Sequence, residues 1–308
     1  MIITTKALEA LLSSFKKEFN DQIFELGASS LHKIIATTIK SNSRTNTYGW
    51  LGRFPQLREW IGDRVFENIK TSSYVIENKK YEATLNVDRV DIEDDNLAMY
   101  RPMARAMADE FIAFLNRNLA DLLKGGFSNV CCDGRSFFGK HQLFEDRDGK
   151  GKYSEISNIY GTPEAKGSPW FLLSLSGTLK PLIIQERTTP EFENITSTTN
   201  ETVFVKDQYI YGIRYRGSFG YGFWQQAVAS KEPLNPKNYE AARLMMQQFK
   251  RDGGDPLGIV PTHLIVSADN ESAARKIVKA QLSDGGNSNI NYDTAELIVS
   301  PWLLQEGV

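Results

Sequence analysis

Apolar residues recur at helical spacing in two long segments of the chain. In the first segment six of them fall on one stripe and Gly27 offers a stop; they are Leu8, Leu11, Leu12, Phe15, Phe19 and Ile23. The second predicts a helix from about Leu97 to Lys124, with acidic residues before its start and Gly125 after its end. At about 1.5 Å per residue this helix would be roughly 40 Å long, which exceeds most globular helices.

Between these helices the chain is first apolar and periodic, then polar, and then rich in aromatic residues. Leu31–Ile39 is again apolar and periodic, and the polar run Ser41–Thr47 predicts an exposed arm or linker. From Tyr48 to Val87, large aromatic residues stand among glycines and charges. A turn at Glu77–Lys80 is expected to join two strands, so we interpret this stretch as a long two-stranded excursion whose apolar tips need a partner surface.

The second half of the chain is mainly β in pattern and ends as α/β. Cys131–Gly167 is polar and rich in glycine, which predicts hairpins and loops. The remaining elements expected are strands at Trp170–Leu175 and Leu179–Gln185, a β region at Val203–Trp224, a helix opened by Asn235, a strand at Thr262–Ser267, a helix capped by Asp269 or Asn270, and a strand at Leu297–Val299.

Charge and cysteine content restrict the class of protein. Among 308 residues, Lys+Arg number 36 and Asp+Glu 38, a net charge of -2 that argues against dedicated nucleic-acid binding but allows weak contact on one face. Cys131 and Cys132 are adjacent, so neither a disulfide framework nor a metal spacing can be built from them. No signal pattern and no run of membrane-spanning length is present, which predicts a protein made in the cytoplasm.

The residues that could carry chemistry are explained better by structural roles. Cys132 with His141 or His263 would make a nucleophile and its base, but no cysteine-hydrolase signature surrounds it, which favours structural cysteines. Glu145–Gly151 departs from a calcium loop and reads better as a solvated turn. In Tyr209–Arg216 the tyrosines share one strand face, which favours core packing over base stacking, with the arginine face left for DNA or a neighbour. We expect no catalytic residue, no cofactor and no metal.

Several distinctive blocks in order resemble the Mu-like phage major head subunit (major capsid protein) family. They are Ser43–Pro55, Glu93–Leu97, Cys132–Phe138, Trp170–Leu173, Leu179–Ile183, Gly220–Trp224 and Pro256–Pro261, and together they cover essentially the whole chain. The resemblance implies an α+β fold, the tailed-phage major capsid fold of the Hong Kong 97-type. Its expected parts are an N-terminal arm (1–47), an extended loop (48–85), a peripheral domain (86–232) with a spine helix (97–124), and an axial domain (233–308).

One departure affects this assignment. In many relatives the axial helix-strand block precedes the long peripheral strands, whereas here the helix-strand block from Asn235 to Val299 ends the chain. For that reason the axial domain is assigned to the C-terminal part.

The resemblance also implies a function without catalysis. Such a subunit would assemble as pentamers and hexamers into the icosahedral head that encloses the double-stranded DNA of a Mu-like tailed phage or prophage. Its partners would be further copies of itself, a scaffolding protein and a portal during assembly in the host cytoplasm, and packaged DNA through weak contact; its place would be the virion. Contacts between subunits are expected from Trp50, Arg53, Phe54, Arg58 and Trp60. The alternatives are an encapsulin-like nanocompartment shell protein and a cysteine-dependent hydrolase.

Overall fold

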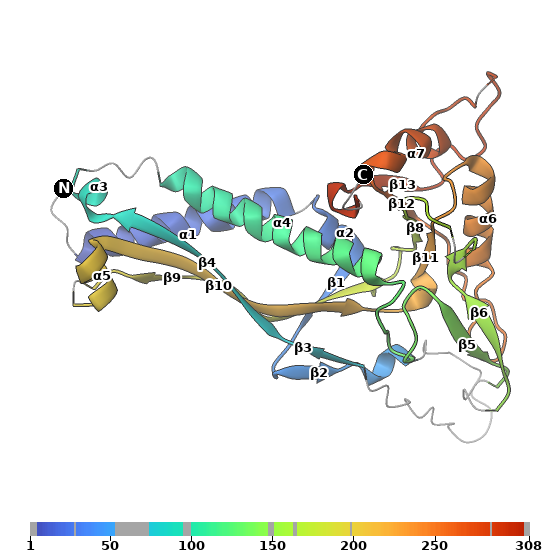
Figure 1. Cartoon of the computed structure of the whole chain (residues 1–308), viewed down its shortest axis with the longest axis horizontal. Coiled ribbons are helices and arrows are strands. Elements are labelled where there is room, and N and C mark those ends of the chain that lie inside the picture. The colour runs from blue at the N-terminus through green and yellow to red at the C-terminus, as the bar shows by residue number, and fades with distance from the viewer. Residues whose placement is uncertain are drawn as a thin grey trace.

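Two long helices lie along a four-stranded sheet through most of the length of the molecule (Figure 1). The computed structural model describes residues 5–27, 29–52, 74–94, 100–146, 151–162, 165–197, 199–283 and 285–304. The helices are α1 (Thr5–Gly27) and α4 (Arg101–Gly125), and the strands run in the order β1 (Ala36–Lys40), β9 (Leu182–Ile195), β10 (Gln208–Tyr221) and β4 (Lys79–Asp88). Only the β1–β9 pair is parallel. Both helices predicted from periodicity are confirmed.

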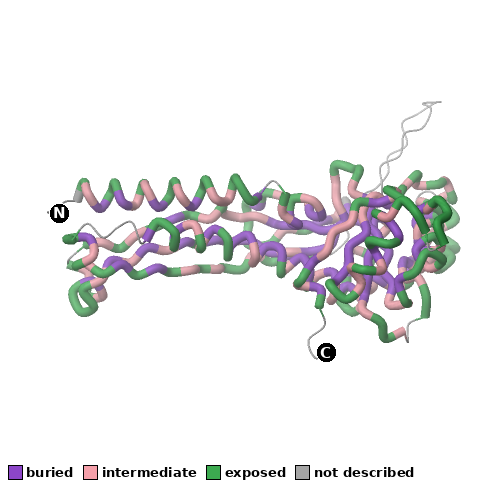
Figure 2. The backbone as a smooth tube through the Cα atoms, turned by 90° about the horizontal axis from the view of Figure 1, so that it is seen from above, coloured by how far each residue is buried: buried purple, intermediate pink, exposed green. Residues whose placement is uncertain are grey.

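The core of this elongated part is aromatic. Tyr209, Tyr211 and Tyr215 of β10 are buried on the sheet face that the helices cover, whereas Arg214 points away and is exposed. Phe15 of α1 meets the Tyr211 ring edge-on at 5.2 Å between centroids. The alternation of buried and exposed positions along the long strands is visible in Figure 2. Core packing, rather than base stacking, is therefore the role of these tyrosines.

Helix α4 begins at Arg101, with Pro102 in its first turn, and residues 95–99 of the expected start lie outside the described part. Small residues at Ala104 and Ala108 are fully buried on the face toward α1, which allows the two helices to approach closely. On the surface Arg105 donates from Nε to Gln22 Oε1 (2.8 Å) and pairs through Nη2 with Glu25 of α1 (2.7 Å). These contacts set the register between the helices.

The other end of the molecule is built on a five-stranded sheet (Figure 1). Its strands, in order, are β13 (Glu296–Val299), β12 (His263–Val266), β8 (Trp170–Leu173), β11 (Ala227–Ser230) and β7 (Ile159–Tyr160), packed with helices α6 (Pro236–Gln247) and α7 (Glu271–Val278). All four residues of β8 are fully buried. Strands β8 and β11 precede position 233 and strands β12 and β13 follow it, so this sheet draws on both sides of the expected domain boundary.

Short elements complete the described chain. They are α2 (Leu31–Ile35), β2 (Thr45–Thr47), β3 (Val75–Glu77), α3 (Arg89–Glu93), the hairpin of β5 (Lys140–Phe144) and β6 (Tyr153–Ser157), α5 (Glu201–Lys206), and 3-10 turns at Gly49–Gly52, Trp224–Gln226, Ala268–Asn270 and Pro301–Leu303. The stretch Leu31–Ile39 is thus part helix and part strand.

The strand pairing expected around Glu77–Lys80 is wrong. Strand β3 pairs with β2, and β4 pairs instead with β10 over ten positions, from Gln208–Asp88 to Gly217–Lys79. Turn residues give a local hairpin signal, but the apolar face of β4 matches the aromatic face of β10 over its full length. The long-range pairing therefore displaces the local one.

His32 links α2 to α4 and is buried. Its backbone N–H donates to Asn116 Oδ1 (2.9 Å), and its ring Nδ1 lies 2.5 Å from Ser30 Oγ. Burial lowers the pKa of His32 from 6.5 to about 4. The folded chain therefore holds this ring neutral where the unfolded chain protonates it.

Acidification is expected to destabilise the subunit through His32. Because the folded pKa lies below the unfolded one, the contribution of His32 to stability is complete above about pH 6.5 and is lost as the pH falls toward 4. The loss between pH 7 and pH 5 should be about 2 kcal/mol, and His32→Gln should remove that part of it. Urea unfolding of wild type and variant at both pH values measures the difference; His263 is retained in both proteins and cancels. Equal pH dependence of the two proteins would contradict the assignment.

Candidate functional site

The two ends of the aromatic excursion leave the fold side by side. Strands β2 and β3 pair antiparallel, with Thr45 opposite Glu77 and Thr47 opposite Val75. The Tyr48 N–H donates to the Tyr74 carbonyl at 2.9 Å, directly beyond the last strand pair. The chain therefore departs at 49–52 and returns at 74 from one fixed point beneath α4 (Figure 1).

Gln185 of β9 ties this base to the sheet. Its Oε1 accepts a hydrogen bond from the Tyr48 hydroxyl (2.7 Å), and its Nε2 donates to the Ile76 carbonyl (3.1 Å) and to Asn78 Oδ1 (2.8 Å). Gln185 is fully buried, and its bonds with Tyr48 and Ile76 form away from water. One side chain thus holds the departing and the returning segment at once.

An apolar cluster fills the space around that amide. Its buried members are Tyr48, Leu51, Ile76, Ile183 and Phe223. The Tyr74 hydroxyl accepts from the backbone N–H of Tyr221 (2.8 Å), and burial raises the pKa of this phenol. Gly220 of β10 lies under the base, where an added Cβ would crowd Ile76 and the Tyr74 hydroxyl. Glycine at this position allows the base to lie directly on β10.

The structure reaches one of the five predicted contact residues, and only in its backbone. Trp50 lies in the 3-10 turn Gly49–Gly52, and its side chain is outside the described part. Arg53, Phe54, Arg58 and Trp60 are likewise outside the described residues. Gln185 was missed from the sequence, although a single amide that ends an apolar strand run was a signal for it.

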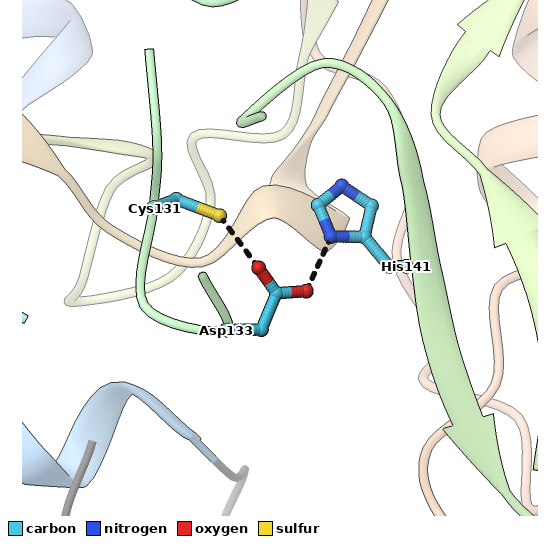
Figure 3. A group of neighbouring side chains, drawn as sticks. All are labelled: Cys131, Asp133 and His141. Atoms are coloured by element: carbon cyan, nitrogen blue, oxygen red, sulfur yellow. Dashed lines mark hydrogen bonds and ion pairs between the residues drawn. The ribbon is translucent and has the colours of Figure 1, made fainter. Parts of the chain in front are cut away.

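A second polar group lies nearby, formed by Cys131 and Asp133 of the loop after α4 and His141 of β5 (Figure 3). The Cys131 thiol donates to Asp133 Oδ1 (3.2 Å), and Asp133 Oδ2 lies 2.6 Å from His141 Nδ1. His141 Nε2 faces the Phe137 carbonyl at 3.2 Å, and its ring stacks on Trp224 with 4.0 Å between centroids. Both ring nitrogens of His141 therefore lie within hydrogen-bond distance of an oxygen acceptor.

This group is arranged for structure rather than for nucleophilic attack. Burial opposes ionisation of Asp133, but its hydrogen bond with His141 holds the pKa of the carboxyl below its usual range. Neighbouring Cys132 and burial raise the pKa of the Cys131 thiol, whereas a nucleophilic cysteine needs a lowered one. The thiol also faces the carboxylate and not the imidazole, and the thiol of Cys132 donates to the Leu51 carbonyl (3.4 Å).

The same three side chains are the described group that comes nearest to a metal site. Cys131 Sγ, an Asp133 oxygen and a His141 nitrogen lie within 4.8 Å of one another. Hydrogen bonds between them already satisfy these atoms, and Asp133 Oδ1 accepts a further bond from the Arg135 N–H (3.0 Å). The arrangement is a closed hydrogen-bond network that shapes the loop.

Removal of the central carboxylate should destabilise the subunit. Asp133→Ala leaves the buried His141 ring and the Cys131 thiol without their acceptor, which should cost about 2–4 kcal/mol of unfolding free energy. Cys131 should also become reactive toward thiol reagents in the native variant, while wild type reacts only on unfolding. The exposed carboxylate of Asp94 provides the control, since Asp94→Ala should change neither readout. Equal stability of Asp133→Ala and wild type would refute the structural role.

A long helix packed on an extended sheet beside a compact end agrees with the tailed-phage major capsid fold that the resemblance implies. A family model described as "Mu-like prophage major head subunit gpT" matches residues 8–303. The chain belongs to this family and is a major capsid protein, a structural component of the phage head in the virion.

Relatives and solved structures agree with this family. The major capsid protein of Escherichia phage Mu is 37% identical over 307 residues, covering 98% of this chain and 100% of that protein. The Mu-like prophage FluMu major head subunit of Haemophilus influenzae is 38% identical, with 91% of each chain covered. A chain from the procapsid of bacteriophage JBD30 has a TM-score of 0.88 at 41% identity, covering 97% of this chain and 100% of that one. A chain from the JBD30 capsid has a TM-score of 0.73 at 30% identity, covering 99% and 100%.

Within the described residues, no helix combines the length and the apolar character needed to cross a bilayer.

Proposed function

We propose that copies of this chain form pentamers and hexamers that tile an icosahedral head around double-stranded DNA. The solved relatives come from an assembled procapsid and an assembled capsid, which supports self-assembly here. The observation that carries the proposal is the fixed base of the excursion, where Gln185 bonds both of its ends. The two segments that flank residues 53–73 are thus held at one place on the sheet, which suits a contact with a neighbouring copy at this site.

The domain layout is part of the same proposal. The elongated part of α1, α4 and the four-stranded sheet would be the peripheral domain, with α4 as the spine helix. The compact end would be the axial domain around the capsomer axis. Because β7, β8 and β11 share its sheet, this axial domain would take in residues before 233 as well as 233–308. Of the segment 48–85 expected from the sequence, the part before β4 would supply the extended loop, because β4 itself belongs to the four-stranded sheet.

Further partners are proposed from the function of a head subunit, because no binding site among the described residues identifies them. A scaffolding protein and a portal would act during assembly, and DNA would meet the inner surface through weak contacts, consistent with a net charge of -2. We assign no catalytic residue and no cofactor, because the cysteine and histidine groups described above are engaged in structural hydrogen bonds.

Trp50, Arg53, Phe54, Arg58 and Trp60 are proposed to contact the neighbouring subunit. Trp50→Ala and Phe54→Ala should each leave the subunit folded but block assembly, since large aromatic side chains supply much of the energy of an interface. Circular dichroism and thermal unfolding measure folding, and electron microscopy with sedimentation measures particles. Phe24→Ala, at a side chain 85% exposed on α1, is the matched aromatic control and should assemble normally. Normal particles from both excursion variants would refute the proposed contact.

A further inference from the structure

The sheet face turned away from α4 carries two adjacent cations that lack a carboxylate. Lys80 of β4 lies directly opposite Arg216 of β10 in the antiparallel register. Their chain neighbours Tyr81 and Tyr215 contact aromatic rings of α4, so both cations point to the opposite face of the sheet. Among the described residues neither cation takes part in an ion pair. Like charges placed directly across a strand pair repel each other.

The strand on the other side of Arg216 supplies no carboxylate either. Its register partner on β9 is Thr188, and the register shifts on both sides of this pair. The Arg216 Nε and the Thr188 hydroxyl oxygen are buried atoms without a hydrogen-bond partner among the described residues. Buried polar atoms that stay unpaired cost free energy, so native structures nearly always give them a partner. These atoms therefore indicate a site for an acceptor from outside the chain.

The neighbouring arginine on the same face has carboxylates across both strand pairs. Arg214 lies opposite Glu82 of β4 and opposite Glu191 of β9. All three of these side chains are exposed. The register thus places opposite charge beside Arg214 and like charge beside Arg216, two residues further along the strand. An oxyanion is missing at the second arginine and not at the first.

The position of the two cations identifies the source of this oxyanion. Arg216 and Gly220 lie on the same face of β10, about 13 Å apart along the strand, and the base of the excursion lies on Gly220. The site therefore adjoins the excursion, which we propose as a contact with a neighbouring copy. A DNA backbone would need an unbroken basic strip, whereas Glu82 and Glu191 interrupt this face. A single carboxylate of another protein chain fits the arrangement better.

We propose that Lys80 and Arg216 bind a carboxylate side chain of a second copy of the chain. The inference rests on the proposed self-assembly, because a shell subunit is surrounded by copies of itself. A guanidinium donates two parallel N–H bonds to one carboxylate, and the Lys80 ammonium and the Thr188 hydroxyl add further donors. The bound carboxylate also offsets the repulsion between the two cations. The pair therefore opposes folding slightly in the free subunit and favours assembly.

Neutralising both cations separates assembly from folding. Lys80→Gln with Arg216→Gln should raise the subunit concentration needed for assembly about tenfold at low salt, and the difference from wild type should shrink at high salt. The thermal midpoint of the free subunit should stay equal or rise, because a repulsion is removed. The matched control is Lys16→Gln with Lys17→Gln, the same charge change at exposed positions of α1, which should assemble like wild type. Assembly of the site variant at the wild-type concentration would overturn the proposal.

A carbodiimide crosslinker identifies the partner directly, because it joins an amine to a carboxylate in contact with it. In particles assembled from an equal mixture of ¹⁴N and ¹⁵N chains, Lys80 should couple to an aspartate or glutamate of a chain with the other isotope. Lys80→Arg keeps the charge but removes the amine, so it should lose this crosslink and assemble at the wild-type concentration. Crosslinks from Lys80 within one chain only, or none in intact particles, would count against the assignment.

Binding of DNA at the same cations is the alternative outcome. A short DNA duplex titrated against the free subunit should bind wild type and the variant with Lys80→Gln and Arg216→Gln equally, as measured by fluorescence anisotropy. Weaker DNA binding by this variant together with normal assembly would assign the site to phosphate and sink the carboxylate proposal. Failure of the wild-type protein to form particles would instead contradict the proposed self-assembly, so the two ideas fail separately.

Discussion

The packing of one aromatic strand face under two helices is the constraint on which the elongated part depends. Tyr209, Tyr211 and Tyr215 of β10 are almost fully buried against α1 and α4, and burying one large apolar side chain stabilises a fold by about 1.5–3 kcal/mol. Among the described residues their hydroxyls have no hydrogen-bond partner, which costs about 1–3 kcal/mol each. The rings therefore act mainly through the area they bury and through edge contacts such as Phe111 with Tyr215.

Strand β10 also contacts the other parts of the molecule. At its end Tyr221 stacks on Phe137 with 4.4 Å between centroids, and its hydroxyl donates to the Leu122 carbonyl near the end of α4. The Tyr221 N–H donates to the Tyr74 hydroxyl at the base of the excursion. Helix α4, the compact end and the excursion are therefore positioned by one strand, so a displacement of β10 would move all three.

The sequence predicted those features that depend on neighbouring residues. The stripe Leu8–Ile23 and the alternating tyrosines of β10 are amphipathic patterns, and both formed as expected because each pattern suits one backbone geometry. Contacts between distant residues carried no such signal. The bond between Tyr48 and Gln185 spans 137 positions, and the pairing of β3 with β2 overrides a nearby turn signal. The five excursion side chains were proposed through family resemblance, and they stay a prediction.

Most of the polar side chains described above find their hydrogen-bond partners within this chain. Gln185 and the Asp133–His141 pair are buried or partly buried, and their hydrogen bonds end on this chain, so they fix loop positions and leave no group directed at a substrate. Glu82 and Glu110 are exposed, and their contacts with Thr84 and Arg117 lie on the surface of the same chain. A subunit that works by fitting its neighbours depends on such closed networks, because they hold its surface in one shape before a neighbour arrives.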